Sequence, residues 1–471
     1  MKTAKILTFC LLLPGAVWAE QVTKTTLLLD STRIARTDNI HITVGRAVKS
    51  SANPLFGEDR PWEPRYDNMY PNVIWDEEAR LYKCWYNPFL VEVEDWEGSN
   101  PTRMRWLYRQ SGLCYATSED GIHWVKPAMN LWPFNGRPSN ILLRDVHGVG
   151  VFRDAHAKQP DRRYKMFYVN EKYGRRTTVA VRFSADGLRW GEPIVLDNFS
   201  IWADTHNNSF WAPTLQRYVT ITRDWDFHNP GPINRVRLVA RTESEDFVHW
   251  SDPEVVFRGL DDNLQIYAMP VFYYAGIYLG LPAIFNISED RVQVELAWSK
   301  DTRNWHRVAP GVPLIPRGEK RGDFDWGCVY AAATPIIRPD GIRLYYGGSD
   351  GPHYGERRGG LGLAILGPDG FAAAEPVDRE RKGAITTVSL AREALSELKV
   401  TADAGTDGDV QIVVLDDQNV EIARSEPLTG SISAHPVIWS VAPDPDGGDV
   451  KLKFILNRAR LYSYQTSDGE G

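Results

Sequence analysis

The sequence predicts an all-β protein, a five-bladed β-propeller followed by a small C-terminal β-sandwich. The motif Ser-x-Asp-x-x-x-Trp occurs four times, and its tryptophans, 66, 60 and 55 residues apart, are spaced like four-stranded blades with their loops. Five pairs of short apolar segments, most of them joined by turn-forming residues, predict five strand hairpins. No helix is expected beyond a turn near residues 390–395.

The first 19 residues have the pattern of a secretory signal peptide. A charged start, an apolar run over residues 6–17 and the small residue Ala19 supply its three regions. No later segment approaches the roughly 18 apolar residues of a membrane-spanning helix. We therefore expect a secreted or periplasmic protein, cleaved near Ala19 and without a membrane anchor, whose residues 20–60 form a leading strand and a long loop.

The predicted propeller covers residues 61–378. Its five hairpins are 72–75 with 81–86, 150–152 with 164–168, 209–211 with 218–221, 270–273 with 277–281, and 335–337 with 342–346. The Ser-x-Asp-x-x-x-Trp motif follows the third strand of a unit, so we expect Ser and Asp to close a peripheral turn and Trp to pack between blades. The fifth unit lacks this tryptophan and is predicted to be the closing blade.

The β-sandwich is predicted over residues 379–465, with a tail at 466–471. Alternating apolar and polar residues at 398–402, 410–415 and 450–456, separated by turns rich in Gly and Asp, are typical of short antiparallel strands.

Composition limits the function classes. A formal charge of −7 argues against a nucleic-acid partner, which would need a basic surface, and 17 Trp and 20 Tyr suit both blade packing and sugar binding. The cysteines left after signal cleavage, Cys84, Cys114 and Cys328, lack the spacing of a zinc site. We expect buried thiols, and a Cys84–Cys114 disulfide is the alternative.

The loops that enter the first strand of each blade meet at one mouth of a propeller. When the hairpins are superposed in register, every entry loop contributes at least one carboxylate. These carboxylates are Asp67, Asp145, Asp204, Asp262 and Asp325, and they are accompanied by His147, His206, Gln265 and Tyr267. Mutual repulsion and partial desolvation push the pKa values of crowded carboxylates apart, so that one stays ionised and another stays protonated. Glycoside hydrolysis needs such a pair of base and acid. Cation binding and plain hydrogen bonding to sugar are the alternatives.

This pattern resembles the five-bladed propeller glycosidases, the superfamily that contains glycoside hydrolase families 32, 43 and 117. The resemblance covers about residues 55–375 and implies a glycan-cleaving enzyme. In fructan-cleaving members an Asp in an Asn-Asp-Pro-Asn-Gly motif is the nucleophile, but Tyr70 stands at that position here, so Asp67 is the nearest substitute. The pair Arg153-Asp154 matches a second motif only superficially, because the repeat register places Asp154 at the far hairpin turn.

The resemblance and the repeat register together suggest residue roles. Asp67 is expected to be the base or nucleophile, and Asp204 or His206 the proton donor, since some superfamily members use a histidine as acid. Asp325 would orient sugar hydroxyls or tune the acid. The predicted substrate contacts are His147, Gln265, Tyr267 and Asp262, and the spare candidates for the acid are Glu63 and Glu319.

Basic side chains near the mouth suit carboxylate or sulfate groups on an acidic polysaccharide. They are Arg65, Arg103, Arg105, Arg317, Lys320, Arg321, Arg357 and Arg358. The alternative is that they are solvated loop charges.

The sequence thus predicts a secreted glycoside hydrolase that acts on a plant, algal or host oligosaccharide or polysaccharide. A propeller that binds glycan without cleaving it is the alternative. A phosphorylase is disfavoured because an exported protein lacks a phosphate supply. No cofactor is expected, and the carboxylates leave open a structural calcium ion.

Overall fold

The computed structural model describes residues 23–467 except 91–109, 172–177, 198, 200, 230, 232, 234 and 445, and it does not describe the side chains of Thr23 and Asp67. The predicted signal peptide and the loop containing Arg103 and Arg105 therefore lie outside the described residues. The all-β prediction is confirmed. The described helices are short 3-10 turns, η1 (Ser31–Arg33), η2 (Pro160–Arg162) and η3 (Arg392–Glu397). None of them is long and apolar enough to cross a membrane.

Three antiparallel sheets follow one another along the chain. The first consists of β6 (Arg65–Asp76), β7 (Leu81–Leu90), β8 (Gln110–Ser118), β9 (Trp124–Val125) and β10 (Ile141–Arg144). The second consists of β11 (Val146–Arg153), β12 (Tyr164–Asn170), β13 (Thr178–Ser184) and β14 (Ile194–Val195). The third consists of β15 (Asn208–Ala212), β16 (Arg217–Asp226), β17 (Val236–Ser244) and β18 (Glu254–Arg258).

The next two sheets share the fourth unit of the sequence. The smaller sheet consists of β20 (Val271–Tyr274), β21 (Ile277–Gly280), β24 (Leu296–Ser299) and β25 (His306–Val308). The other has nine strands, β19 (Leu264–Ile266), β22 (Ala283–Asn286), β23 (Arg291–Val294), β26 (Cys328–Ala331), β27 (Ile336–Arg338), β28 (Gly341–Ser349), β29 (Gly359–Leu366), β4 (Val48–Lys49) and β5 (Phe56–Gly57). The N-terminal loop thus supplies the outer edge of this sheet.

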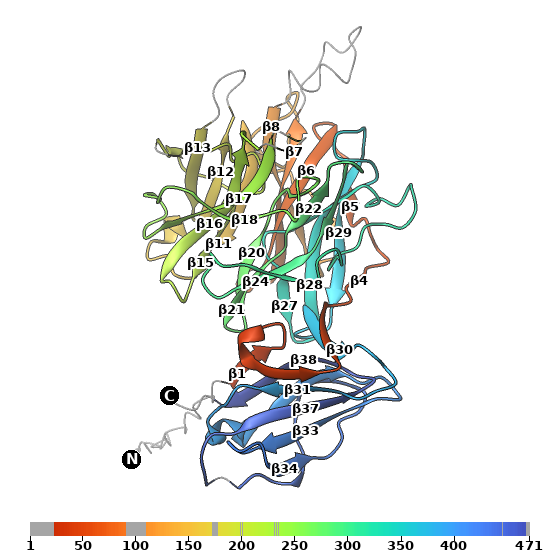
Figure 1. The fold of residues 1–471 in the computed structure, drawn as a ribbon. Helices are drawn as coiled ribbons and strands as arrows, with labels where there is room; N and C mark the ends of the chain where they lie inside the picture. The colour runs from red at the N-terminus through yellow and green to blue at the C-terminus, as the bar shows by residue number, and fades with distance from the viewer. Residues whose placement is uncertain are drawn as a thin grey trace, which may run out of the picture.

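Two six-stranded sheets make up the lower part of Figure 1, which is blue except for the red N-terminal strands. One consists of β1 (Thr23–Leu27), β3 (Ile40–Val44), β30 (Ala372–Pro376), β32 (Lys399–Asp403), β35 (Ser431–Pro436) and β38 (Arg460–Ser467). The other consists of β2 (Ile34–Asp38), β31 (Gly383–Thr387), β33 (Asp409–Leu415), β34 (Glu421–Ser425), β36 (Trp439–Val441) and β37 (Lys451–Asn457). N-terminal and C-terminal strands therefore build this region together.

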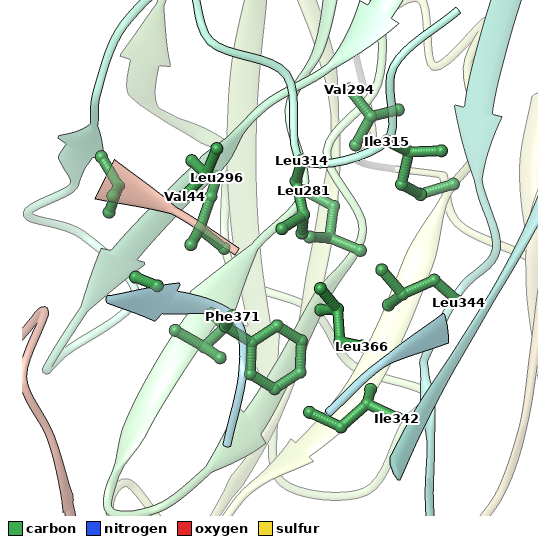
Figure 2. Close-up of a cluster of buried hydrophobic side chains, with 14 of the residues drawn as sticks. Val44, Leu281, Val294, Leu296, Leu314, Ile315, Ile342, Leu344, Leu366 and Phe371 are labelled. Carbon is green, nitrogen blue, oxygen red and sulfur yellow. The ribbon is translucent and has the colours of Figure 1, made fainter. Parts of the chain in front are cut away.

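An apolar core joins the two regions of the molecule. Val44 from β3 and Phe371, which precedes β30, are buried against side chains of the sheets above them (Figure 2). Those neighbours include Leu281, Leu296, Leu344 and Leu366. Apolar burial of this kind favours a fixed arrangement over a flexible tether.

The repeated motif closes turns as predicted. In the first unit, Ser118 Oγ donates to Asp120 Oδ1 at 3.0 Å, and the same carboxylate oxygen accepts from the backbone N–H groups of Ile122 and His123 at 2.8 Å. The turns at Ser184, Ser244 and Ser299 repeat these hydrogen bonds. Such Asx turns satisfy backbone donors locally and fix the path of the chain between strands.

Each of these turns contacts a neighbouring sheet. Trp124 packs edge-on against Tyr345 of β28 at 5.8 Å, and Trp250 against Phe167 of β12 at 5.3 Å. Trp85 of β7 donates to the carbonyl oxygen of Gly187 at 2.7 Å, and Arg241 of β17 donates to Thr302 at 2.7 Å. The first sheet thus contacts the nine-stranded sheet, and each later turn contacts the sheet before it.

These turns predict a loss of stability in acid. Partial burial opposes ionisation of Asp246 and Asp301, but backbone N–H donors outweigh burial and lower both pKa values to about 2. An unfolded Asp titrates near 3.9, so this contribution is fully present above about pH 4 and is lost as the pH falls toward 2. In urea titrations Asp301→Asn should fall below wild type at pH 6, and the gap should close toward pH 2.5. A gap that is constant with pH would contradict this origin.

The cysteines behave as expected. Cys84, Cys114 and Cys328 are buried free thiols, so the alternative of a Cys84–Cys114 disulfide is not realised.

Candidate functional site

Residues just before the first predicted strand of all five units converge on one cluster of aromatic and polar side chains. Tyr70 of β6 is fully buried, and its ring lies 5.8 Å from His147, 5.4 Å from His206 and 6.5 Å from Tyr330. Tyr267, directly after β19, lies 5.4 Å from Tyr330. We call this set the central cluster, and it consists of Asn68, Tyr70, His147, Asp204, His206, Tyr267, Tyr330 and His353.

A distortion of β6 turns two of these side chains inward. Met69 and Tyr70 have φ angles of 62° and 41°, and the pairing of β6 with β7 shifts register on both sides of Met69. Left-handed backbone at residues other than glycine costs about 1–3 kcal/mol and is concentrated at functional sites. The bulge lets Asn68 Nδ2 donate to the hydroxyl groups of Tyr70 at 2.8 Å and Tyr267 at 3.2 Å. Asp67 precedes this bulge.

Asp204 and His147 form the polar centre of the cluster. His147 Nε2 lies 2.8 Å from Asp204 Oδ1, and the Asp204 side chain is 51% exposed whereas that of His147 is 1% exposed. On its other side, His147 Nδ1 lies 3.4 Å from Ser111 Oγ, which donates to Glu171 at 2.6 Å. A chain of hydrogen-bonding groups therefore runs from Glu171 through Ser111 and His147 to Asp204.

Two glycines set the distance between His147 and Asp204. A Cβ on Gly150 would lie 1.6 Å from the carbonyl oxygen of Asn207, and one on Gly148 would lie 1.9 Å from that of Thr205. The turn that carries Asp204 consequently lies directly on β11.

Gly150→Ala should force these segments apart. We expect a loss of about 1–3 kcal/mol in the free energy of unfolding, as in other overpacked sites, together with impaired function of Asp204. Urea denaturation measures the first effect. Gly276→Ala is the control, because a Cβ there meets no atom within 4 Å, although its φ of +82° carries some strain. Equal stability of Gly150→Ala and wild type would contradict the close approach.

His206 lies deeper than Asp204. Its Nε2 is 3.1 Å from Asn72 Oδ1, and burial lowers its pKa to about 3. The imidazole is therefore neutral at physiological pH and has no extra proton to donate. Its contacts with Tyr70 and Asn72 fit a residue that holds the cluster in place.

Three arginines lie around Tyr267 and His353 of the cluster. Arg223 of β16 lies with its guanidinium 4.3 Å from the centre of the Tyr267 ring, and that of Arg237 of β17 lies 5.1 Å from it. Arg357 donates to Asn68 Oδ1 at 3.0 Å. Burial and the charges of these three arginines lower the pKa of His353 well below its usual range, so this side of the cluster is strongly positive.

An exposed aromatic rim adjoins the arginines. Trp202, Phe227 and Tyr354 are 61%, 47% and 55% exposed, which is unusual for large aromatic side chains. Phe227 lies 5.8 Å from Trp202 and 6.2 Å from the half-buried Trp225. Flat rings beside polar groups suit the apolar faces and hydroxyl edges of sugars.

The structure brings some of the sequence-predicted residues together and separates others. His147, Asp204, His206 and Tyr267 lie in the central cluster. Gln265 is fully buried and accepts from Arg237 at 3.1 Å, which makes it a support for that arginine. The side chain of Asp67 lies outside the described part of the structure.

The remaining predicted residues have other partners. Asp262 accepts from Asn229 at 2.8 Å. Asp325 is 2.6 Å from Lys49 and accepts from Tyr346 at 2.8 Å. Glu63 is paired with Lys126 at 2.6 Å, and Glu319 is exposed in a loop.

The register argument against Asp154 agrees with its surroundings. Asp154 is 2.7 Å from Lys165 and accepts from Tyr218 at 2.7 Å. Asp76 has the same kind of partners one unit earlier, Lys83 at 2.6 Å and Tyr164 at 3.0 Å. Two equivalent buried ion pairs at hairpin turns indicate a structural role.

Sequence reasoning missed Arg223, Arg237, His353 and Glu58. The first two lie in second and third strands, which the comparison of entry loops did not include. Glu58 accepts from the backbone N–H groups of Tyr66 and Gly359, and burial raises its pKa to about 7.

Among the described residues, no group of three or more His, Cys, Asp or Glu side chains is arranged to hold a metal ion.

Comparison with known proteins gives distant similarities. No family model matches the chain. Over 356 residues, 67% of this chain, it is 23% identical to the A type blood N-acetyl-α-D-galactosamine deacetylase of Flavonifractor plautii, and it spans 42% of that protein. It also resembles the structures of a glycosyl hydrolase from Bacteroides ovatus (14% identity, 71% of this chain and 98% of that one, TM-score 0.46) and of β-1,2-mannobiose phosphorylase from Listeria innocua (12% identity, 68% and 97%, TM-score 0.47). At these levels of similarity, function has to be inferred from the central cluster itself.

Proposed function

We propose that this chain is a secreted or periplasmic glycoside hydrolase whose five sheets are the blades of a β-propeller and whose two six-stranded sheets form a β-sandwich. The order of contacts supports the propeller, since the first sheet contacts the nine-stranded sheet and each later turn contacts the sheet before it. The observation that carries the function is Asp204, a half-exposed carboxylate hydrogen-bonded to a buried histidine beside an exposed aromatic rim. Such a site can bind a sugar ring and exchange a proton with it.

We assign proton transfer to Asp204. The hydrogen-bonded chain through His147 and Ser111 to Glu171 supplies a route by which Asp204 regains a proton after donating it to the leaving oxygen. Asp67, on the strand whose bulge carries Asn68 and Tyr70, would act as base or nucleophile. The distance between the two carboxylates would decide between inversion and retention.

Other residues would support this pair. His206, neutral and buried, keeps Tyr70 in place. Asp325, through its ion pair with Lys49, would act on the site only indirectly, by holding the loop before β26. Tyr267 and the aromatic rim would contact the substrate.

A second enzymatic function follows from the Flavonifractor plautii relative, which is a carbohydrate deacetylase. In that case the central cluster would bind an acetylated amino sugar. A glycan-binding protein without catalytic activity is the non-enzymatic alternative.

One screen separates these functions. The purified full-length protein is incubated with neutral, acidic and N-acetylated oligosaccharides, with and without inorganic phosphate, and the products are identified by chromatography and mass spectrometry. We expect new reducing ends without added phosphate. Acetate release would indicate a deacetylase, sugar phosphate a phosphorylase, and binding without any product a glycan-binding protein.

A further inference from the structure

Two buried arginines lie beside the central cluster, one with no described carboxylate nearby and the other with a carboxylate only at 3.9 Å. Arg237 is 7% exposed, and no described carboxylate lies within 4.0 Å of it. Its guanidinium donates to Gln265 Oε1 and to the Tyr354 hydroxyl, both neutral acceptors. Arg223 is 2% exposed and donates to the Tyr267 carbonyl oxygen, and Asp204 is 3.9 Å away.

Both guanidinium groups retain hydrogen-bonding capacity. The Nε atoms of Arg223 and Arg237 are buried and have no hydrogen-bond partner among the described residues. A buried charge without an ionic partner is costly and is normally paired, so the buried charge of Arg237 fits a site in which a ligand supplies the counter-charge. The rings of Trp225 and Tyr267 offset part of this cost through cation–π contacts.

The two arginines are placed to meet a ligand at the mouth. Tyr354, which accepts from Arg237, is 55% exposed, and Asp204, which lies near Arg223, has a 51% exposed side chain. Both guanidinium groups therefore lie within 4 Å of side chains that reach the surface. Trp225 contacts both of them and continues into the aromatic rim.

We propose that Arg223 and Arg237 form a subsite for an oxyanion group carried by the sugar, the carboxylate of a uronic acid or a sulfate ester. Guanidinium groups bind such planar or tetrahedral oxyanions with paired hydrogen bonds. The anionic group would lie next to Asp204 while the sugar ring stacks on the rim. This inference rests on the proposed glycan-binding function and adds that the substrate is acidic.

Binding to the full-length protein tests the subsite without requiring turnover. The probes are glucuronate, galacturonate and glucose 6-sulfate, compared with glucose, galactose and inorganic phosphate, by titration calorimetry and thermal shift. We expect an acidic sugar to bind at least about tenfold more tightly than its neutral counterpart, since charge-assisted hydrogen bonds are the strong ones. Equal binding of acidic and neutral sugars would overturn the subsite. So would inorganic phosphate that binds more tightly than every acidic sugar, because the anion would then not belong to the sugar.

Variants locate the effect. Arg237→Gln should lose the preference for acidic sugars, and Arg237→Lys, which keeps the charge but not the paired donors, should retain part of it. Arg424→Gln is the matched control. Arg424 of β34 forms a surface ion pair with Glu421, so this variant should leave binding unchanged. Thermal unfolding of each variant shows whether it is folded. A folded Arg237→Gln variant with undiminished preference would contradict the proposal, whether or not the protein cleaves glycans.

Discussion

Asp204→Asn should lower the rate of glycan hydrolysis by about 10²- to 10⁴-fold, the usual contribution of a general acid or base. The amide keeps the size of the side chain and can accept from His147, but it cannot deliver a proton. The measurement is the initial rate of reducing-end release on the best substrate of the screen. Because Asp204 is half exposed, the variant should fold with wild-type stability.

Asp262→Asn is the matched control for this variant. Asp262 belongs to the same predicted row of entry-loop carboxylates, but its carboxylate accepts from Asn229. Its variant should keep more than half of the wild-type rate. If the two variants lost activity equally, the assignment of Asp204 would be wrong.

Lys126→Met should cost about 3–5 kcal/mol in the free energy of unfolding, because it leaves a buried carboxylate without its cation. Lys126 Nζ lies 2.6 Å from Glu63 and 2.7 Å from Asp59, and the side chains of Lys126 and Glu63 are 2% and 0% exposed. This network ties the segment before β6 to the first sheet. Urea denaturation at pH 7 measures the loss.

The pH dependence of this loss identifies Glu63 as its source. Burial already raises the pKa of Glu63, and the charge of Lys126 opposes that rise. Without Lys126 the folded-state pKa rises further, so stability is retained below about pH 4 and lost as the pH increases. The deficit of Lys126→Met should therefore shrink at pH 5. In the double variant Lys126→Met/Glu63→Gln it should also be smaller, and a deficit unchanged in both tests would point to lost packing instead.

The sequence could predict the repeated turn because the interactions that form this turn are local. Ser118 and Asp120 bond to backbone groups within three residues, so the turn is encoded in the motif itself, and the register that it fixes brought Tyr70, His147, His206 and Tyr267 together. The same register explained Asp154 as an equivalent of Asp76. Local hydrogen bonds and regular spacing are the part of this fold that a sequence displays directly.

The features that the sequence could not predict depend on contacts between distant segments. The pairing of β1 with β38 and of β3 with β30 joins the two ends of the chain, and nothing local marks these strands as partners. The predicted boundary at residue 379 falls after β30, which pairs with β3 and β38 in one of the six-stranded sheets. The repeat register placed Asp325 among the entry-loop carboxylates. Its ion pair with Lys49 of β4, however, depends on an N-terminal loop that is not part of any repeat.

The role of Asp204 as proton donor is tested most directly by how its loss depends on the leaving group. The rates of wild type and Asp204→Asn are compared on the natural oligosaccharide and on the 2,4-dinitrophenyl glycoside of the same sugar, whose leaving group needs no proton. We expect a loss of about 10²-fold or more on the oligosaccharide and less than about tenfold on the activated glycoside. An equal loss on both substrates would contradict proton donation by Asp204.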